Sequence, residues 1–316
     1  MEICPEILIV STKDDYATDY IAFYLNKVNA SYLRLNIDQL SDFSINIDPY
    51  SPEIYGDGTN FSFKIDPDIL KSIYFRAPVF WKDQYNGNLS PDQQFSYNQW
   101  ATFIQSLIIF EDVLWVNHPQ KVYSAENKPY QLYKARKLGF KTPETIITNS
   151  NKNNSILEKN TVVIKTLGSM MLNINDSDGF IYTNIVNNKN LQNGDISSAP
   201  VILQETLIPK VDIRVTVIRN KVFAVSIKKD EQGINTDWRL EESVEYEKIK
   251  LPKNIEKKCI ELTETLGLKY GGIDLLIHND NHYFIEINPT GDWMWLINHL
   301  DLEIDEEIVK LLLEGK

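Results

Sequence analysis

Three oxygen-bearing side chains within residues 270–292 have the types and spacing of a cation-binding site. Two runs rich in β-branched and aromatic residues flank a short polar segment at residues 279–281, a pattern typical of a β-hairpin. If those three residues form the loop, Asp274 lies opposite Glu286 on the neighbouring strand. Because side chains alternate between the two faces of a strand, Asp274, Glu286 and Asn288 are predicted to project from one face.

The reverse face of this predicted hairpin is apolar and is expected to be core. The same register places His278 opposite His282 at the end of the hairpin, where both rings would be solvated. The apolar face would consist of Ile273, Leu275, Ile277, Tyr283, Ile285 and Ile287.

The facing carboxylates of Asp274 and Glu286 need a partner. Directly opposed β-carbons in an antiparallel pair lie about 4.5–5.5 Å apart, and like charges at that distance are destabilising. The repulsion is relieved when one carboxylate takes up a proton or when a cation lies between the two. Two carboxylates and an amide suit Mg²⁺, which takes one or two carboxylates together with water and substrate phosphates. The alternative is a surface hairpin whose acidic side chains are solvated.

Two further segments place polar side chains at predicted strand ends. Lys165 ends an apolar strand, where its ammonium group would either neutralise an anion such as phosphate or reach water. Gln204, Glu205 and Thr206 follow another strand, and the backbone there could contact a purine or form a plain linker.

Two Asp–Arg combinations and one isolated arginine could bind an anion. Asp212 and Arg214 share the polar face of a predicted strand, and Asp237 and Arg239 precede an acidic run. In both cases a simple salt bridge is the alternative. Arg76 follows an apolar strand and is a candidate clamp for a carboxylate, because a guanidinium binds carboxylates through two parallel hydrogen bonds. A structural pair is the alternative for Arg76.

The composition is that of a globular chain with more than one domain. The 316 residues are 43% hydrophobic and 24% charged, and chains beyond about 250–300 residues usually divide into domains. A net charge of −12 argues against broad binding to nucleic acid or to an anionic membrane, although it allows a local basic groove. We find no apolar run near the roughly 18 residues of a spanning helix, no signal peptide, and no disulfide framework from Cys4 and Cys259. A cytoplasmic location is expected.

The elements that must position these residues are predicted to form an α/β protein of two or three lobes. A strand–helix–strand opening over residues 6–38 resembles the start of a doubly wound sheet, without the Gly-rich turn of a dinucleotide site. Ser90 is predicted to cap a helix, and Gly139 to end a single helix over 124–138. Further expectations are a polar hairpin over 45–65, a flexible cover over 167–171, helix plus loop over 184–199, strands over 161–166, 201–206, 211–218 and 222–228, and helices over 254–266 and 304–313.

Taken in order, these motifs resemble the ATP-grasp ligases across nearly the whole chain. The matching features are Lys128 in Glu-Asn-Lys-Pro, Lys165 in Val-Val-Ile-Lys, Gln204-Glu205, Asp212-Ile-Arg214, Asp237-Trp-Arg239, Gly272-Ile-Asp274 and Glu286-Ile-Asn288-Pro. Within that superfamily, Asp-Trp-Arg, Tyr-Phe-Arg-Ala-Pro and Glu-Ile-Asn-Pro-Thr-Gly-Asp-Trp resemble the graspetide (microviridin-type) peptide synthetases. Those enzymes macrocyclise ribosomal precursor peptides through ω-ester or ω-amide bonds. The chain departs from the family at Ala77, where a second arginine often follows Arg76.

The resemblance implies both a fold and a set of residue roles. The fold would be ATP-grasp, with an N-terminal doubly wound pre-ATP-grasp domain over 1–118, a central lobe over 119–200 and a C-terminal lobe over 201–316. Arg214 and Arg239 would face the γ-phosphate and the acyl-phosphate formed from it, and Arg76 would contact the substrate. The cofactor residues would be Lys128 and Lys165 at the ATP phosphates, Gln204, Glu205 and Thr206 around the adenine, Asp212 at the ribose, and Asp274, Glu286 and Asn288 at two Mg²⁺.

The implied function is an ATP-dependent macrocyclase of a precursor peptide. An Asp or Glu side chain of the peptide would be activated as an acyl-phosphate, with release of ADP, and joined to a Ser or Thr hydroxyl or a Lys amine. The expected partners are a peptide with a leader and an acidic core, and a second copy of the chain in a homodimer. Two alternatives stay open: a ligase for a small molecule or a protein tail, similar to glutathione synthetases or glutamate ligases, and a catalytically silent nucleotide-binding scaffold.

Overall fold

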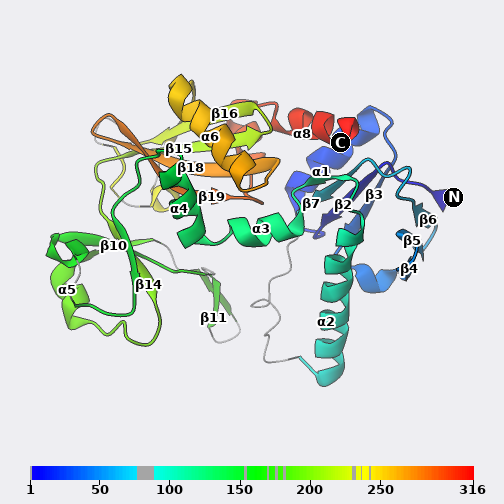
Figure 1. The fold of residues 1–316 in the computed structure, drawn as a ribbon, viewed down its shortest axis with the longest axis horizontal. Helices are drawn as coiled ribbons and strands as arrows, with labels where there is room; N and C mark the ends of the chain where they lie inside the picture. The colour runs from blue at the N-terminus through cyan, green and yellow to red at the C-terminus, as the bar shows by residue number, and fades with distance from the viewer. Residues whose placement is uncertain are drawn as a thin grey trace.

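The computed structural model describes residues 2–76, 89–152, 155–168, 171–174, 177–180, 183–229, 233–235, 237–241 and 243–316. Figure 1 shows an N-terminal body at the right, a smaller middle lobe at the lower left and a C-terminal body above that lobe. None of the helices described is long and apolar enough to cross a membrane.

A parallel four-stranded sheet forms the N-terminal body. Its order is β3-β2-β7-β8, with β2 at Ile7–Ser11, β3 at Tyr32–Asn36, β7 at Ser72–Phe75 and β8 at Leu114–Val116. All of β2 is buried, as expected for a parallel strand covered on both faces. Helix α1 (Tyr16–Lys27) and the C-terminal helix α8 (Ile304–Glu314) pack on one face. The predicted strand–helix–strand opening is confirmed, and the last helix of the chain covers its first sheet (Figure 1).

The other face of this sheet packs on a second sheet and on helix α2 (Pro91–Ser106). The second sheet has the order β1-β6-β5-β4, with β1 at Glu2–Ile3, β4 at Ser44–Asp48, β5 at Glu53–Asp57 and β6 at Ser62–Ile65. The prediction of a polar hairpin over 45–65 was incomplete, because Ile54, Phe63 and Ile65 give these strands a buried apolar face. Ser90 caps α2 through a capping box with Gln93, as predicted.

The prediction of a single helix over 124–138 is wrong. The structure has α3 (Pro119–Ala125) and α4 (Lys128–Lys137). The side chain of Asn127 accepts a hydrogen bond from the backbone N–H of Tyr130, so Asn127 acts as a new N-cap that starts the second helix. Gly139 ends α4 with a φ of 77°, as predicted from its lack of a side chain.

The middle lobe is an antiparallel sheet of order β13-β10-β14-β9. The strands are β9 at Thr145–Thr148, β10 at Thr161–Lys165, β13 at Asn184–Asn187 and β14 at Val201–Glu205. Residues 184–199, predicted as helix plus loop, begin instead with β13, because Val186 packs against the small core of this lobe; helix α5 (Asn188–Asn193) follows. The strands β11 (Met171–Ile174) and β12 (Ser177–Phe180) form a separate ribbon. The cover predicted over 167–171 falls partly outside the described residues.

The strand pairing can be compared with the boundary expected at residue 200, between the central lobe and the C-terminal lobe. β14 pairs with β10 and β9, so the chain stays in the middle lobe as far as Glu205. Helices α3 and α4 pack instead on the C-terminal body, through Ala125 and Ala135. A middle lobe that begins after these helices and ends after β14 fits the pairing better than one over 119–200.

The C-terminal body is a five-stranded antiparallel sheet of order β17-β16-β15-β18-β19. One face packs on α6 (Lys253–Thr265) and α4 through a buried apolar cluster. The other face carries the polar residues of the predicted site. The strands are β15 at Val211–Ile218, β16 at Lys221–Lys228, β17 at Glu245–Ile249, β18 at Tyr270–His278 and β19 at Asn281–Asn288; η5 (Trp238–Leu240) and α7 (Met294–Leu300) complete the body.

The hairpin β18–β19 confirms the predicted pairing of Asp274 with Glu286 but corrects the loop. The turn has two residues, Asn279 and Asp280, with φ of 48° and 59°, and His278 opposes Asn281 rather than His282. Both φ values are positive, as in a type I′ turn, whose twist matches that of the two strands.

The shorter turn is compensated by a bulge, which changes the predicted core. The register shifts by one residue after Asp274, so that Leu275 opposes Phe284 and Ile285 is the extra residue. Phe284 is therefore fully buried in the core, where Tyr283 and Ile285 were expected. Ile285 instead lines the cavity on the polar face.

Candidate active site

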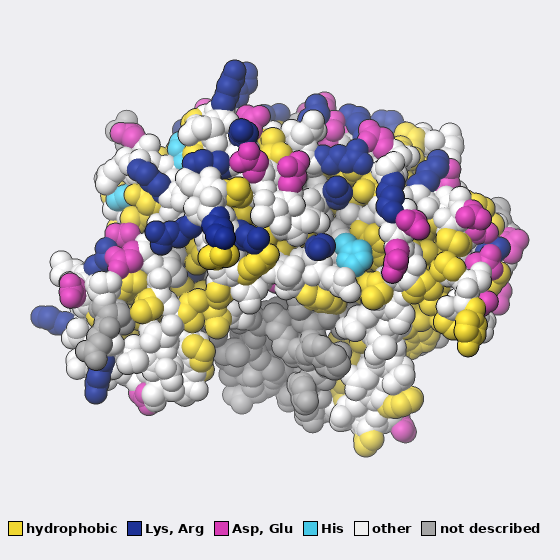
Figure 2. Space-filling view, viewed as in Figure 1, with side chains coloured by type: hydrophobic (Ala, Val, Ile, Leu, Met, Phe, Trp, Pro, Cys, Tyr) yellow, Lys and Arg dark blue, Asp and Glu magenta, His cyan; other side chains and the backbone are white. Residues whose placement is uncertain are grey.

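A cavity of about 360 Å³ lies between the middle sheet and the polar face of the C-terminal sheet. All the predicted site residues except Arg76 line it. The described lining carries the cations Lys128, Lys165, Lys210, Arg214 and Arg239 and the carboxylates of Glu126, Glu205, Asp212, Asp237, Asp274, Glu286 and Asp292. On the outer face shown in Figure 2, positive and negative side chains are likewise interspersed.

Asp274, Glu286 and Asn288 meet on the polar face of the hairpin, as predicted. Asn288 Nδ2 lies 3.3 Å from Asp274 Oδ2 and 3.5 Å from Glu286 Oε1. Among the described residues, no group of three or more His, Cys, Asp or Glu side chains forms a metal site. The two carboxylates and the amide of this hairpin suit Mg²⁺ that takes its other ligands from phosphate and water.

The two facing carboxylates have opposite pKa shifts. Burial raises the pKa of Asp274 to about 6; Arg214 opposes this shift and the charge of Glu286 adds to it. Burial also raises the pKa of Glu286, but Lys128 and Lys165 outweigh burial and leave that pKa below its usual value. In the absence of a cation, Glu286 therefore stays ionised and Asp274 is the carboxylate that takes up a proton.

Arg214 lies beside the carboxylate pair on the adjacent strand β15. Its Nη1 is 3.1 Å from Asp274 Oδ1, and β15 pairs the two residues directly with β18. Arg214 Nε and Nη1 are buried and make no hydrogen bond of good geometry within the described chain. Gly272 makes room for this guanidinium, because a Cβ there would lie 3.2 Å from Nη1. Buried donors without an acceptor are costly, so Arg214 is suited to an anionic ligand.

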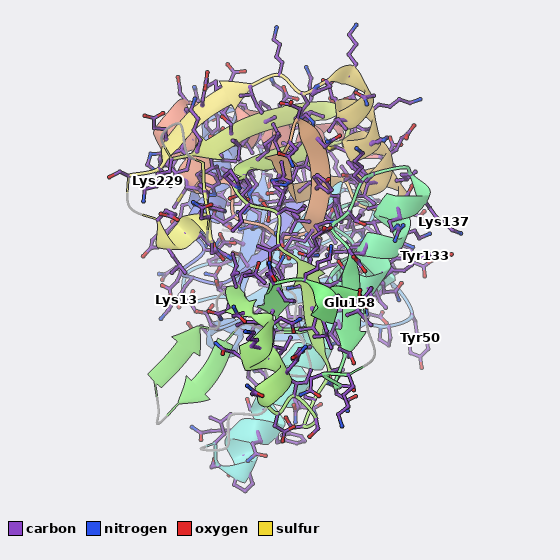
Figure 3. The ribbon with its side chains drawn as sticks, turned by 90° about the vertical axis from the view of Figure 1, so that its left-hand side faces the viewer. Lys13, Tyr50, Tyr133, Lys137, Glu158 and Lys229 are labelled. Atoms are coloured by element: carbon purple, nitrogen blue, oxygen red, sulfur yellow. The ribbon has the colours of Figure 1, made fainter. Side chains whose placement is uncertain are left out.

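Two predicted lysines approach the same place from other elements. Lys128, the first residue of α4, places Nζ 3.6 Å from Glu286 Oε2. In the second half of α4, Tyr133 and Lys137 point outward (Figure 3). Lys165 Nζ donates to Gln204 Oε1 at 3.0 Å, and burial lowers the pKa of this lysine. A half-buried lysine that is hydrogen-bonded to a neutral amide gains from a bound anion.

The predicted nucleotide residues have protein partners of their own. Glu205 accepts from Lys159 at 2.7 Å and from the backbone N–H of Glu144 at 3.2 Å. Thr206 has a buried hydroxyl with no hydrogen-bond partner among the described residues, which leaves this group available to a ligand. Asp212 pairs with Lys210; burial raises the pKa of Asp212 and Lys210 opposes that shift.

Arg239 enters the cavity on η5, held by its neighbour Asp237. Nε and Nη2 of Arg239 donate to the two oxygens of Asp237 at 2.8 and 2.6 Å, and the same carboxylate accepts from the Arg239 backbone N–H. The simple salt bridge considered from the sequence is therefore present. The pair lines the cavity, which allows both roles.

Arg76 does not line the cavity, and it forms the structural pair that was the alternative. Its Nε donates to Asp15 Oδ2 at 3.1 Å, and Nη1 donates to the carbonyls of Thr290 and Gly291 at 2.9 and 3.2 Å. The side chain is only 9% exposed. Arg76 thus ties the N-terminal sheet to the loop after Asn288, and a direct contact with substrate stays a prediction.

Sequence reasoning missed three residues that build the site. Lys210 stands two residues before Asp212, a spacing that could have indicated the pair. Gln131 exchanges hydrogen bonds with the backbone of Ile287 and so fixes α4 against β19. Asn117 donates to the carbonyls of Tyr270 and Pro289 at 2.8 and 2.7 Å. The last two link segments more than 150 residues apart, and no local pattern indicates them.

The fold and the site define an ATP-grasp enzyme. Residues 136–312, more than half of the chain, match the family model described as the RimK-like ATP-grasp domain. The chain belongs to this family. The predicted fold and the predicted class of enzyme, an ATP-dependent ligase, are thereby confirmed.

One known protein that is similar to part of this chain is a glutamate ligase. The tetrahydromethanopterin:alpha-L-glutamate ligase of Methanocaldococcus jannaschii is 26% identical over 103 residues, which are 33% of this chain and 35% of that protein. The match thus spans about a third of each protein.

Several solved structures share the whole fold. A RiPP-associated ATP-grasp ligase of Chryseobacterium gregarium, in complex with ADP and a leader and core peptide, has a TM-score of 0.83 at 22% identity, with 98% of this chain and 97% of that chain covered. The macrocyclase MdnC of Microcystis aeruginosa, bound with precursor peptide MdnA, has a TM-score of 0.81 at 23% identity. That comparison covers 98% of this chain and 99% of MdnC. The ATP-grasp ligase PsnB, complexed with minimal precursor, Mg and ADP, has a TM-score of 0.78 at 19% identity. That comparison covers 99% of this chain and 98% of PsnB.

Proposed function

We propose that this enzyme is an ATP-dependent macrocyclase of a ribosomally made precursor peptide. It joins Asp or Glu side chains of the peptide to Ser or Thr hydroxyls, as esters, or to Lys amines, as amides. The observation that carries the proposal is the pair Asp274–Glu286, held against Arg214 inside a cavity rich in cations. The full-length likeness to ligases that bind precursor peptides supports a peptide as the substrate.

Asp274, Glu286 and Asn288 are the residues that would hold Mg²⁺, and we propose two ions. The raised pKa of Asp274 and the contacts of Asn288 fit this role, because a bound cation would compensate the burial of the Asp274 carboxylate and its repulsion by Glu286. Bound Mg²⁺ would neutralise charge on the ATP phosphates.

The nucleotide would lie along the rest of the cavity. Lys128 and Lys165 would contact the phosphates. Gln204, Glu205 and Thr206 would border the adenine. The carboxylate of Glu205 would keep its ion pair with Lys159, and the hydroxyl of Thr206 would face the ligand. Asp212, oriented by Lys210, would accept from the ribose hydroxyls.

The reaction needs two anions to meet. A peptide carboxylate attacks the γ-phosphate of ATP and displaces ADP, and the resulting acyl-phosphate is then attacked by the hydroxyl or amine, which releases phosphate. Arg214 and Arg239 would face the transferred group, where their charge lowers the repulsion between carboxylate and phosphate. Positioning and electrostatics therefore carry most of the catalysis in this proposal.

The proposal extends to the setting of the enzyme. We expect a homodimer in the cytoplasm that binds a peptide with a leader and an acidic core. Mass spectrometry is the decisive test: the short peptide encoded beside this gene, incubated with enzyme, ATP and Mg²⁺, should lose one water for each ring. ADP release that depends on the peptide should accompany the loss. No loss of water from any encoded peptide would overturn the proposal.

A second candidate is a ligase that adds an amino acid to a small molecule or a protein tail. The match over 103 residues to a protein named as a glutamate ligase favours it. A gain of mass on an acceptor supplied with glutamate, without loss of water from a peptide, would select this function.

A further inference from the structure

Asp292 differs from five of the other carboxylates that line the cavity. Within the described chain, no lysine or arginine lies within 4.0 Å of its carboxylate, although Asp292 lines the cavity and is exposed. By contrast, a cation contacts each of Glu205, Asp212, Asp237, Asp274 and Glu286.

The loop that carries Asp292 is fixed on both sides of it. Before Asp292, the carbonyl of Gly291 accepts from Arg76 Nη1 at 3.2 Å and from the Tyr270 hydroxyl at 2.7 Å. After it, Trp293 is fully buried and its indole N–H donates to the hydroxyl of Tyr74 at 3.3 Å. Asp292 is therefore presented to the cavity from a rigid support.

This loop also passes next to the centre of the site. A methyl group added at Gly291 would lie 3.1 Å from Asn288 Cβ and 3.9 Å from Arg214 Nη1. Oδ1 of Asp292 accepts from the backbone N–H of Met294 at 3.0 Å, which orients the carboxylate. Oδ2 has no hydrogen-bond donor among the residues the structure describes.

The second half of the proposed reaction needs a proton acceptor. A hydroxyl acceptor must lose its proton as it attacks the acyl-phosphate. A lysine acceptor must lose one proton to solvent before it attacks as the neutral amine, and a second proton as the amide forms. A carboxylate held by a cation is a poorer base than a free one, since the cation stabilises the ionised form. Five lining carboxylates are each held by a lysine or arginine, and Asp292 is not held by one within the described chain.

We propose that Asp292 is the general base that activates the acceptor, an inference that rests on the proposed function. The acceptor oxygen or nitrogen forms a bond to the carbonyl carbon of the acyl-phosphate, and its proton passes to Asp292 Oδ2. The bond between that carbon and the phosphate oxygen breaks, and phosphate leaves with the electron pair. The protonated Asp292 then returns its proton to solvent or phosphate. The Asp of protein kinases takes a proton from a substrate hydroxyl in the same way.

Substitution of Asp292→Asn tests this role without removing the contact that orients the side chain, because the amide oxygen can still accept from Met294. Ring formation should fall by about 100-fold or more, the range of a lost general base. Acyl-phosphate formation should persist, and it is measured by trapping with hydroxylamine, a strong nucleophile that needs no base. The variant should yield peptide hydroxamate at a rate close to that of the wild-type enzyme.

Asp280→Asn is the matched control. Asp280 lies at the exposed turn of β18–β19, outside the cavity lining, and its φ of 59° is a conformation that Asn also adopts. This variant loses the same charge and should form rings at the wild-type rate.

Three results would overturn the inference while the proposed function stands: ring formation by Asp292→Asn within about threefold of the wild-type rate, equal loss of rings and of hydroxamate, or a raised KM for the peptide with an unchanged kcat. The last two would place Asp292 in the first step or in peptide binding. Failure of the wild-type enzyme to form either rings or hydroxamate would instead overturn the proposed function itself.

Discussion

Arg214 and Asp274 face each other across the two central strands of the C-terminal sheet, with Nη1 and Oδ1 3.1 Å apart. The contact is an ion pair by distance, yet Nη1 makes no well-aligned hydrogen bond within the described chain. The guanidinium is therefore close enough to oppose the raised pKa of Asp274 but keeps donors for another anion. A ligand phosphate would accept hydrogen bonds from Arg214, and Mg²⁺ between that phosphate and the carboxylate pair would neutralise charge on both.

Asp274→Asn and Glu286→Gln should each abolish ATP-dependent turnover and leave the fold intact. Either change removes one of the two charges expected to hold Mg²⁺, and we expect activity to fall by more than about 100-fold. The measurement is ADP release and loss of water from the peptide, with circular dichroism to check the fold. Ring formation at the wild-type rate by either purified variant would exclude the metal assignment.

Gly272→Ala should impair the enzyme by displacing Arg214. The new methyl group would lie 3.2 Å from Nη1, so the guanidinium has to shift by a few tenths of an ångström. We expect kcat to fall by about tenfold, since misplacement by 1 Å can cost about 100-fold. Gly194→Ala is the control: its methyl group would meet a backbone oxygen at 3.3 Å, outside the cavity lining, and kcat should not change. Equal activity of both variants would contradict a role for the position of Arg214.

Stabilisation by Mg²⁺ and nucleotide should depend on pH. The pKa of Asp274 in the folded protein is about 6, above its ordinary value of 3.8. The proton therefore stabilises the ligand-free protein fully below about pH 4, and this stability is lost as the pH rises through about 6. A cation competes with that proton, so the rise in Tm on adding Mg²⁺ and ADP should be larger at about pH 7.5 than at about pH 5.

Thermal melts across this pH range check the prediction. Asp274→Asn is the control, because it has no proton to lose and its Tm shift should be small at every pH. An equal shift for the wild-type protein at both pH values would mean that Asp274 does not titrate at the ligand site.

For residues that share a strand or a hairpin, the sequence was sufficient to predict which side chains lie on the same face. Alternation placed Asp274, Glu286 and Asn288 on one face, and Asp212 and Arg214 on another, because a strand repeats every two residues. The turn was misjudged, since Asn279 and Asp280 both adopt positive φ and the bulge at Ile285 restores the register. Such compensation depends on how the two strands twist, which local propensity does not encode.

The contacts between distant segments were beyond prediction. Arg76 was judged by its place after an apolar strand, which also suits a substrate clamp. Its actual partners, Asp15 and the carbonyls of Thr290 and Gly291, are 61 to 215 residues away. Their proximity results from the packing of the C-terminal body on the N-terminal sheet, so only the assembled fold reveals the pair.

The pair Arg76–Asp15 should stabilise the junction between the N-terminal sheet and the loop after Asn288. The Asp15 and Arg76 side chains are 14% and 9% exposed, so Arg76→Met leaves a largely buried carboxylate without its cation. We expect the free energy of unfolding to fall by about 3–5 kcal/mol, measured by urea denaturation. Arg76→Met with Asp15→Asn should be less destabilised than the single variant, because no unpaired charge then remains buried. If both variants match the wild-type protein, the junction does not depend on this pair.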